Sequence, residues 1–457
     1  MRKLTSEIAA FVSGNRYAAV PEAAIGAIKN ALSDYAAVSV LGSDEETTRI
    51  VASFEETGST GEARICFSDR RGPARAAALI TGTAAHAHDY DDVGIAFHPA
   101  HPSVAIAPAV LAQAEAQGAT GWQVLEAFAT GYEVWSELAS RDARPHHLRG
   151  VHPTGFFGTV AAAAGVARLM DLDQPTASNA LAIGASQAAG LVANFGSMTK
   201  PFHAGRAAAA GLMSARYAAA GMTASPDVFE HRHGFLRALS PEGDVDLERP
   251  CHFGQSWHLV DHGIGVKLYP LCYGNHRIIN SLTKYVNAMD LPAEEIDHVT
   301  YRTAPSRVVS LVHTKPETVL DARFSAEFAV AMSVVARRAT LAELTDEFFG
   351  RADVRELMGK VERDLDPARE PAHFNGETDD LLEFRMKDGS VRSLKLESPD
   401  DLAISLDRNV LWDKFRDCTS AAMDEQQARG LFDALQNLEQ FGDVRELPVY
   451  KAATSTH

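Results

Sequence analysis

The sequence of 457 residues has few of the features that mark redox, thiolate-metal, nucleotide-binding or membrane proteins. Its four cysteines are scattered and form no CxxC pair, which argues against a disulfide framework and a cysteine-based zinc site. No apolar run reaches the roughly 18 residues of a membrane span. Glycine-rich phosphate loops, a GxSxG elbow and a Rossmann fingerprint are absent. These absences indicate a protein of a reducing compartment that binds no nucleotide.

Positive charge is also scarce. The chain carries 43 Lys and Arg against 60 Asp and Glu, a formal net charge of -17, which disfavours binding to nucleic acid. Hydrophobic residues make up 46% and charged residues 23%, as in ordinary globular proteins. The first twenty residues lack the apolar core of a signal peptide, and we interpret them as a short amphipathic helix. We therefore expect a cytoplasmic protein that binds neither nucleic acid nor membrane.

The pattern of hydrophobic residues changes along the chain. Up to about Ser240 it is helical almost throughout. Residues 296–303 alternate like a strand, and residues 381–397 form two strand patterns around Asp388-Gly389, a typical hairpin turn. Helical patterns return near the C-terminus. The order predicts a helical domain that is interrupted by a smaller domain of mixed structure.

We predict a mainly α fold on this basis. A large all-helical domain would comprise residues 1–265 and 400–457, and a smaller α+β domain of residues 266–399 would be inserted into it. The length of the chain fits two or three domains, and the insert is close to the usual domain size.

Three of the predicted helices begin beside a basic side chain and a proline. His101 and His152 precede Pro-Ser and Pro-Thr, and Lys200 precedes a proline that His203 and Arg206 follow. Each start alone is explained as an ordinary capped helix. A helix N-terminus, however, presents N–H groups and a positive dipole end to anions. Together the three starts predict a cationic site for a carboxylate or phosphate.

A metal site is the alternative interpretation of the segment HAHDYDD. His86 and His88 alternate before Asp89, as histidines do in some metal-dependent hydrolases. The preceding residues predict a helix, on which residues i and i+2 do not share a face, so we favour a site without metal. Asp91 and Asp92 are interpreted as solvated or capping acids.

A further group of reactive side chains lies where the two predicted domains join. Lys267, Tyr269, Cys272 and His276 fall within ten residues. Interdomain clefts often bind ligands, so these residues are candidates for the site. An aromatic seam between domains is the alternative.

The order of these motifs resembles the MmgE/PrpD family, which contains 2-methylcitrate dehydratase, cis-aconitate decarboxylase and iminodisuccinate epimerase. The resemblance implies a homodimer without cofactor or metal, built from a helical domain and a smaller α+β lid with the site between them. The matching segments are GTAAHAHDYDD, HPAHPS, GVHPTGFFGTVAAAA, SQAAGLVANFGSMTKPFHAGRAAAAG and VKLYPLCYGNH.

Position by position, the resemblance places Asp89, His101, His152, Lys200 and Lys267 in the pocket. The chemistry that it implies is proton transfer at a carbon next to a carboxylate, which needs fixed positive charge for the enediolate and a positioned base. We expect the two lysines to bind a small di- or tricarboxylate. The two histidines would transfer protons, and Asp89 would orient a histidine.

Other candidates remain beside these five. Cys272 is a rival base, because a thiolate close to a lysine also exchanges protons. The candidate residues for substrate binding include His98, His203, Arg206 and Tyr269.

The sequence leaves the reaction open among epimerisation, dehydration and decarboxylation. The segment VKLYPLCYGNH is more similar to the epimerase branch than to 2-methylcitrate dehydratase. Val93 and Phe328 depart from residues that are common in lyase and decarboxylase members. Two other hypotheses stay open: a metal-dependent hydrolase that uses His86, His88 and Asp89, and a non-catalytic protein that binds polycarboxylates.

Overall fold

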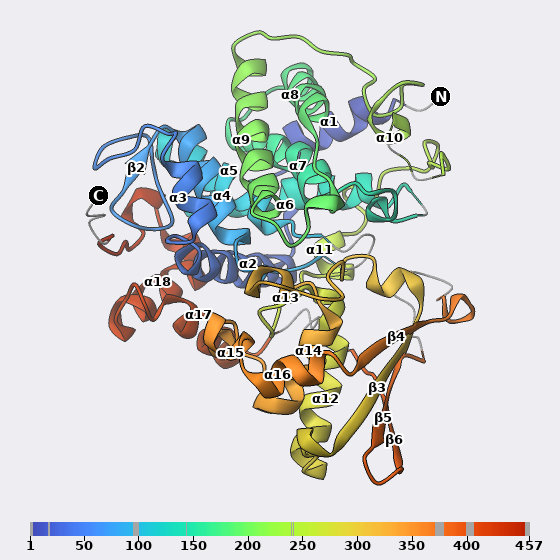
Figure 1. Cartoon of the computed structure of the whole chain (residues 1–457). Helices are drawn as coiled ribbons and strands as arrows, with labels where there is room; N and C mark the ends of the chain where they lie inside the picture. Colours follow the sequence, from blue (N-terminus) through green and yellow to red (C-terminus); the bar gives the residue numbers. More distant parts are fainter. Residues whose placement is uncertain are drawn as a thin grey trace. The chain divides into compact units, whose positions relative to one another are not determined.

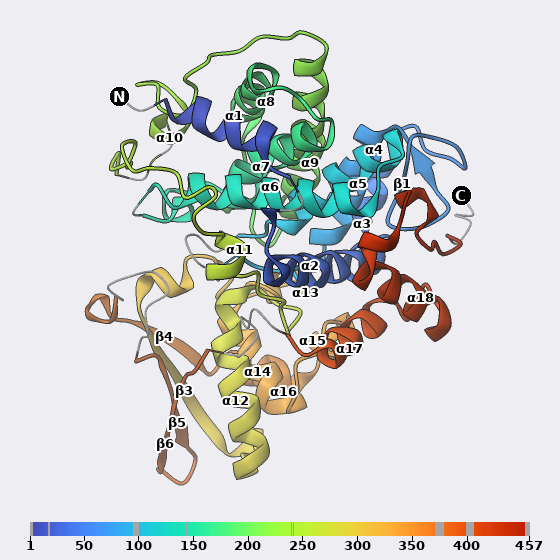
Figure 2. The same ribbon diagram turned by 180° about the vertical axis from the view of Figure 1, so that it is seen from behind.

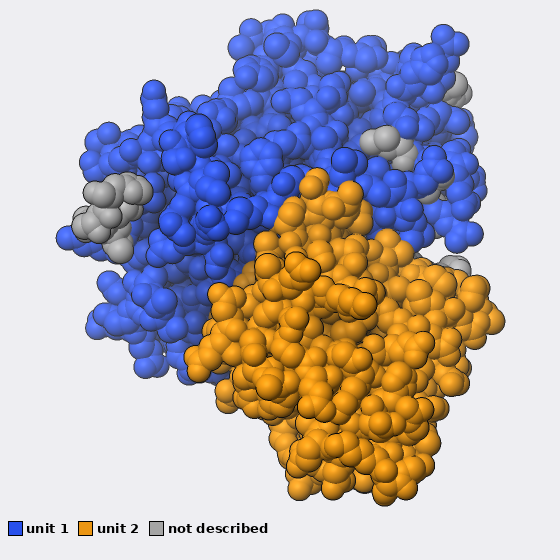
Figure 3. All heavy atoms as spheres, in the orientation of Figure 1, with its two compact units in different colours: residues 1–191, 198–266, 402–457 blue, residues 192–197, 267–401 orange. Residues whose placement is uncertain are grey.

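The computed structural model describes residues 3–16, 19–94, 100–142, 144–238, 240, 242–370, 379–398 and 406–452. The chain forms two compact units, which Figure 3 distinguishes by colour. Unit 1 comprises residues 1–191, 198–266 and 402–457, and unit 2 comprises residues 192–197 and 267–401.

Unit 1 is a group of helices with one short pair of antiparallel strands (Figure 1). The pair, β1 and β2, means that this unit is not strictly all-helical as the sequence predicted. Its elements are α1 (Leu4–Gly14), α2 (Glu22–Leu41), α3 (Glu46–Ala52), β1 (Ala63–Arg64), β2 (Arg71–Gly72), α4 (Ala74–His86), α5 (Ser103–Gln117), α6 (Gly121–Ala139), α7 (Pro153–Leu169), α8 (Gln174–Gln187), α9 (Thr199–Ala219), α10 (Phe235–Ala238), α11 (His258–Asp261), α17 (Arg408–Thr419) and α18 (Glu425–Gln436).

The core of unit 1 is built around α7, all of whose residues are buried. This helix packs against α5, α6, α8 and α9, and α9 also packs against α4. The close packing depends on small side chains: a Cβ atom on Gly82 of α4 would lie 2.9 Å from the Cα atom of Gly205 on α9. The alanine- and glycine-rich sequences of these helices therefore let their axes approach closely, and this approach brings the starts of the helices together.

The C-terminal helices return to the N-terminal part of unit 1. Helix α17 packs against α2 and against α18, and both views show the red C-terminal helices beside the dark blue α2 (Figures 1 and 2). Residues more than 350 positions apart in the sequence thus share one part of the core.

Unit 2 combines short helices with a four-stranded sheet. The strand order is β4-β3-β5-β6; β3 and β4 run parallel, and the other neighbouring strands run antiparallel. The predicted strand 296–303 and the hairpin with its turn at Asp388-Gly389 are confirmed. The elements are α12 (His276–Met289), β3 (Ile296–Thr303), α13 (Val319–Ala322), α14 (Ala326–Ala336), α15 (Asp346–Phe349), α16 (Ala352–Met358), β4 (Val361–Leu365), β5 (Leu381–Met386) and β6 (Val391–Lys395).

The mainly helical fold class is confirmed by this architecture. The action of residues 266–399 as a lid stays a prediction. Among the described residues, no helix has the length and apolar character that crossing a membrane requires.

The contact between α4 and α9 gives a prediction about stability. In Gly205→Ala the added methyl group would overlap the Leu79 carbonyl oxygen and the Thr83 hydroxyl, so we expect a loss of about 1–3 kcal/mol in the free energy of unfolding. Gly430→Ala on α18 is the matched control, because no atom lies within 4 Å of its added Cβ. Urea unfolding measures both variants, and equal stability of the two would contradict the packing.

Candidate active site

The candidate site in unit 1 forms where three helices begin. Helices α5, α7 and α9 start at Ser103, Pro153 and Thr199, as the sequence predicted, and they bring His101, His152 and Lys200 close to His86 at the end of α4. The ring centroid of His86 lies 4.5 Å from that of His101 and 5.8 Å from that of His152. The Lys200 Nζ atom lies 2.9 Å from His86 Nε2.

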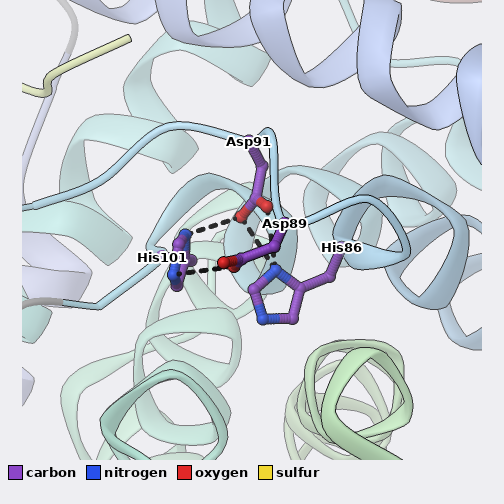
Figure 4. Close-up of side chains that lie close together, drawn as sticks. All are labelled: His86, Asp89, Asp91 and His101. Carbon is purple, nitrogen blue, oxygen red and sulfur yellow. Dashed lines mark hydrogen bonds and ion pairs between the residues drawn. The ribbon is translucent and has the colours of Figure 1, made fainter. Parts of the chain in front are cut away.

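The side chains of His86, Asp89, Asp91, His101 and Lys200, which we call the histidine–carboxylate cluster, are all buried. Asp91 joins its two rings. Its carboxylate oxygens lie 2.9 and 3.0 Å from His86 Nδ1, and Oδ2 lies 2.9 Å from His101 Nδ1 (Figure 4). Burial alone would raise the pKa of Asp91, but its electrostatic interactions and hydrogen bonds with His101 and His86 outweigh burial and hold this pKa well below its usual value. Asp91 is therefore an ionised acceptor.

The backbone defines which ring nitrogen of His101 carries a proton. Nδ1 lies 2.8 Å from the carbonyl oxygen of Asp92, and a carbonyl can only accept a hydrogen bond. Nδ1 is therefore the N–H, and in the neutral ring Nε2 carries the lone pair. That atom lies 3.6 Å from Asp89 Oδ1. The backbone N–H of His101 donates to the Thr154 hydroxyl at the start of α7, 3.1 Å away. The ring is thus oriented as a base.

His86 is held neutral between an acid and a lysine. Burial lowers its pKa to about 3, although Asp91 opposes the shift. With its proton on Nδ1 toward Asp91, its Nε2 atom accepts a hydrogen bond from the Lys200 ammonium group. The ring therefore links the negative charge of Asp91 to the positive charge of Lys200.

Lys200 also pairs with Asp89, whose Oδ1 lies 2.6 Å from the Lys200 Nζ atom. Asp89 has a backbone φ of 51°, in the left-handed region that few residues other than glycine adopt. Its N–H donates to the carbonyl of His86, 3.2 Å away, which closes the turn after α4. The tight turn places the carboxylate of Asp89 beside the lysine.

A second pair of histidines lies at the start of α7. Nδ1 of His152 is 3.0 Å from Nδ1 of His203, so one ring donates and the other accepts. Burial and the charge of Lys200 lower the pKa of His152 well below its usual value. Burial, Arg206 and Lys200 lower the pKa of His203 to about 4. Both rings are therefore neutral at neutral pH.

The segment that follows α8 positions this pair. The His152 N–H donates to the Gly190 carbonyl, 3.1 Å away, and a Cβ on Gly190 would lie 3.2 Å from the His152 Cβ. The Arg206 guanidinium donates to the carbonyls of Gln187 and Ala189 at 2.5 and 3.1 Å. Arg206 thus binds the end of α8, and its role in substrate binding stays a prediction.

The remaining predicted residues lie elsewhere in the chain. His98 lies outside the described residues. Lys267, Tyr269 and Cys272 belong to unit 2. Cys272 is part of the buried apolar core of that unit, and Tyr269 packs against it. Their roles at the site stay predictions.

Two interpretations from the sequence need correction. Asp91 and Asp92 are not solvated acids, because their exposed fractions are 0% and 1%. Among the described residues, the side chains with the spacing of a metal site include His86 and Asp89 but not His88, whose Nε2 atom lies 3.0 Å from Glu45 Oε1. The sequence signal for Asp91 was the repeated acid in DYDD, but its burial depends on two histidines that the sequence does not place.

A different set of side chains has the spacing of a metal site. One ligand atom each from His86, Asp89, Asp91 and His101 lies within 4.8 Å of the others. The Lys200 ammonium group, however, already contacts His86 Nε2 and Asp89. A divalent ion there would be repelled by that charge, so the donor set fits the lysine better than a metal.

Comparison with known proteins shows the family to which this chain belongs. The MmgE/PrpD N-terminal domain matches residues 6–248, and the MmgE/PrpD C-terminal domain matches residues 269–440. The chain belongs to the MmgE/PrpD family. The match indicates a lyase-type enzyme, which favours catalysis over the hypothesis of a binding protein without activity.

The relatives found among curated proteins share about a quarter of their residues with this chain over nearly its whole length. The cis-aconitate decarboxylase of Homo sapiens is 26% identical, over 98% of this chain and 94% of its own. That of Mus musculus is 25% identical over 98% and 93%. That of Aspergillus terreus is 24% identical over 97% and 95%.

The neutral state of His86 gives a prediction for the pH dependence of stability. Between its usual pKa of 6.5 and its folded pKa of about 3, the unfolded chain binds the extra proton, so stability is lost as the pH falls through this range. His86→Gln should reduce the slope of unfolding free energy against pH by up to about 1.4 kcal/mol per unit. Urea unfolding from neutral to acidic pH measures the slope. The exposed His233→Gln is the control, and equal slopes in both variants would contradict a neutral His86.

Proposed function

We propose that this protein is a cofactor-independent lyase that decarboxylates a small unsaturated tricarboxylate of the cis-aconitate type. The observation that supports it best is the pairing of a buried lysine with an oriented basic ring: Lys200 lies 2.6 Å from Asp89, and His101 presents Nε2 beside the same carboxylate. The relatives named cis-aconitate decarboxylase support the choice of substrate.

The charge of Lys200 is the electrostatic part of the proposed reaction. A carboxylate of the substrate would replace Asp89 as the partner of the Lys200 ammonium group. The positive end of the α9 dipole lies at the same helix start and would also attract this carboxylate. When the C–C bond to the departing carboxylate breaks, CO2 leaves. The electron pair of that bond stays on the substrate, which becomes an extended enolate. A fixed positive charge in a buried site stabilises that negative charge without reorganising.

The histidines provide the proton transfer. After CO2 has left, the carbanionic carbon takes a proton, and an imidazolium ring is its donor. His101 suits this role because Asp91 stabilises the charged ring and holds Nδ1, while Nε2 releases the proton and recovers it from solvent. His152, oriented by His203, is the second candidate, and it needs the charge of the bound polycarboxylate to favour its protonated form. The sequence analysis expected Asp89 to orient the histidine. In this proposal Asp91 has that role.

The reaction is tested by incubating the EDTA-treated protein with a panel of di- and tricarboxylates in D2O. Proton NMR should show loss of the tricarboxylate, and one deuterium should enter the product for each CO2 released. Epimerisation would instead show deuterium uptake without CO2, and dehydration would show loss of a hydroxyl. The proposal is wrong if no member of the panel reacts or exchanges.

A metal-dependent reaction is the second candidate, because the ligand atoms of His86, Asp89, Asp91 and His101 have suitable spacing. Elemental analysis of the purified protein separates the two. A stoichiometric divalent ion whose removal abolishes turnover, and whose return restores it, would favour the metal and overturn the role of Lys200.

Replacement of Lys200 should lower kcat/KM more than replacement of Lys29, another lysine of unit 1. Lys200→Met removes the charge that stabilises the enolate, and kcat/KM should fall by about 2–4 kcal/mol of transition-state stabilisation. Lys29→Met, which removes a lysine of α2 that pairs with Glu439, is the control. Steady-state kinetics compares them. A loss below about tenfold for Lys200→Met would contradict its catalytic role.

The two carboxylates of the cluster should differ in their effects. Asp91→Asn should lower kcat by about 10²–10⁴ with little change in substrate affinity, because the amide no longer accepts from both ring N–H groups. Asp89→Asn should have a smaller effect on kcat, since Asp89 Oδ1 lies 3.6 Å from His101 Nε2, whereas Asp91 Oδ2 lies 2.9 Å from His101 Nδ1. Single-turnover rates and ligand titration measure both variants. A larger loss of kcat in Asp89→Asn would reverse the assignment.

A further inference from the structure

A second group of buried charges contacts the same chain segment as the histidine–carboxylate cluster. Lys414 of α17 lies with its Nζ atom 2.6 Å from Asp34 Oδ1 on α2, and the two side chains are 5% and 0% exposed. The same Nζ atom donates to the carbonyl oxygen of Tyr90, 2.7 Å away, and lies 3.9 Å from the centroid of the Tyr90 ring. Tyr90 stands between the two acids of the cluster in the sequence.

Asp92 connects this group to His101. Its carboxyl group lies close enough to Asp34 for the two acids to interact electrostatically, and its carbonyl oxygen accepts from His101 Nδ1 at 2.8 Å. Its side chain accepts from the hydroxyl of Ser103, the first residue of α5. The next residue, Val93, exchanges two backbone hydrogen bonds of 2.8 and 2.9 Å with Gly265. Residues 90–93 are thus held on several sides.

Burial favours a retained proton on the acids of this group. It raises the pKa of Asp34 above its usual value, although the adjacent Lys414 opposes the shift. Burial and the negative charge of Asp34 raise the pKa of Asp92 well above its usual value, which favours its protonated form. One lysine therefore faces one carboxylate. Buried ion pairs of this kind add little net stability, yet removal of one partner is costly. This pattern favours a role in specifying a conformation.

We propose that Asp34 and Lys414 are positioning residues, which fix the backbone of residues 90–93 and so hold His101 Nδ1 on the Asp92 carbonyl and on Asp91. Neither side chain needs to touch the substrate. The kinetic part of this inference rests on the proposed function, whereas the backbone part does not, and the two are measured separately.

The backbone part is tested by amide hydrogen exchange in Lys414→Met. Loss of the contacts to Asp34 and Tyr90 should raise exchange at residues 90–94 at least about tenfold, while α7 keeps the exchange of the unmodified protein. Arg416→Met is the matched control, because it removes a partly exposed cation from the same helix and should change neither region. Lys414→Arg keeps the charge and should restore part of the protection.

The kinetic part uses the tricarboxylate that the NMR panel identifies. Lys414→Met should lower kcat by about tenfold or more with KM nearly unchanged, because the proton donor His101 is misaligned while Lys200 still binds the substrate. If no substrate reacts, the exchange result still decides the inference, although the proposed function fails.

Two results would overturn the positioning role. Unchanged exchange at residues 90–94 in Lys414→Met would show that the pair does not hold the segment. An equal rise in exchange at residues 90–94 and in α7 would show that the pair only stabilises the whole unit. If Lys414→Met does not fold, Asp34→Asn takes its place, because it removes one charge at nearly constant size. Its exchange at residues 90–94 is then compared with its exchange in α7.

Discussion

The site depends on keeping a carboxylate ionised where water does not reach. Asp91 is completely buried, and its charge is stabilised by the N–H groups of His86 and His101. Because each ring commits Nδ1 to this contact, each presents Nε2 on its other side. The protonation pattern of the cluster therefore follows from one acid: Lys200 donates to Nε2 of one ring, and Nε2 of the other is left as a base.

The helical scaffold makes this arrangement possible at short range. The close approach of α4 and α9 brings His86 and Lys200 within hydrogen-bond distance, and the start of α7 adds the hydroxyl that fixes the backbone of His101. Residues 86–101, Thr154 and Lys200, which come from three separate parts of the sequence, thus contribute side chains to one buried group. Fixed charges in such a place act on a reacting anion more strongly than they would in water.

Local patterns were sufficient to predict the elements and the helix starts, because strand 296–303, the hairpin turn at Asp388-Gly389 and the prolines that begin helices depend on neighbouring residues. They also identified His101, His152 and Lys200. The burial of Asp91 was not predictable in this way, since an acid in DYDD is ordinary on a surface. The contact of Lys414 with Tyr90 joins residues 324 positions apart, which no local pattern encodes.

The central claim, that Asp91 sets the protonation of the cluster, is tested most directly by measuring which nitrogen is protonated in each of the two rings that share Asp91. Nitrogen-15 NMR of protein labelled in histidine, with assignments from His86→Gln and His101→Gln, reports which ring nitrogen carries the proton near neutral pH. The account predicts a proton on Nδ1 of both rings and an unprotonated Nε2 on His86. Rings that carry the proton on Nε2 and leave Nδ1 bare would contradict it.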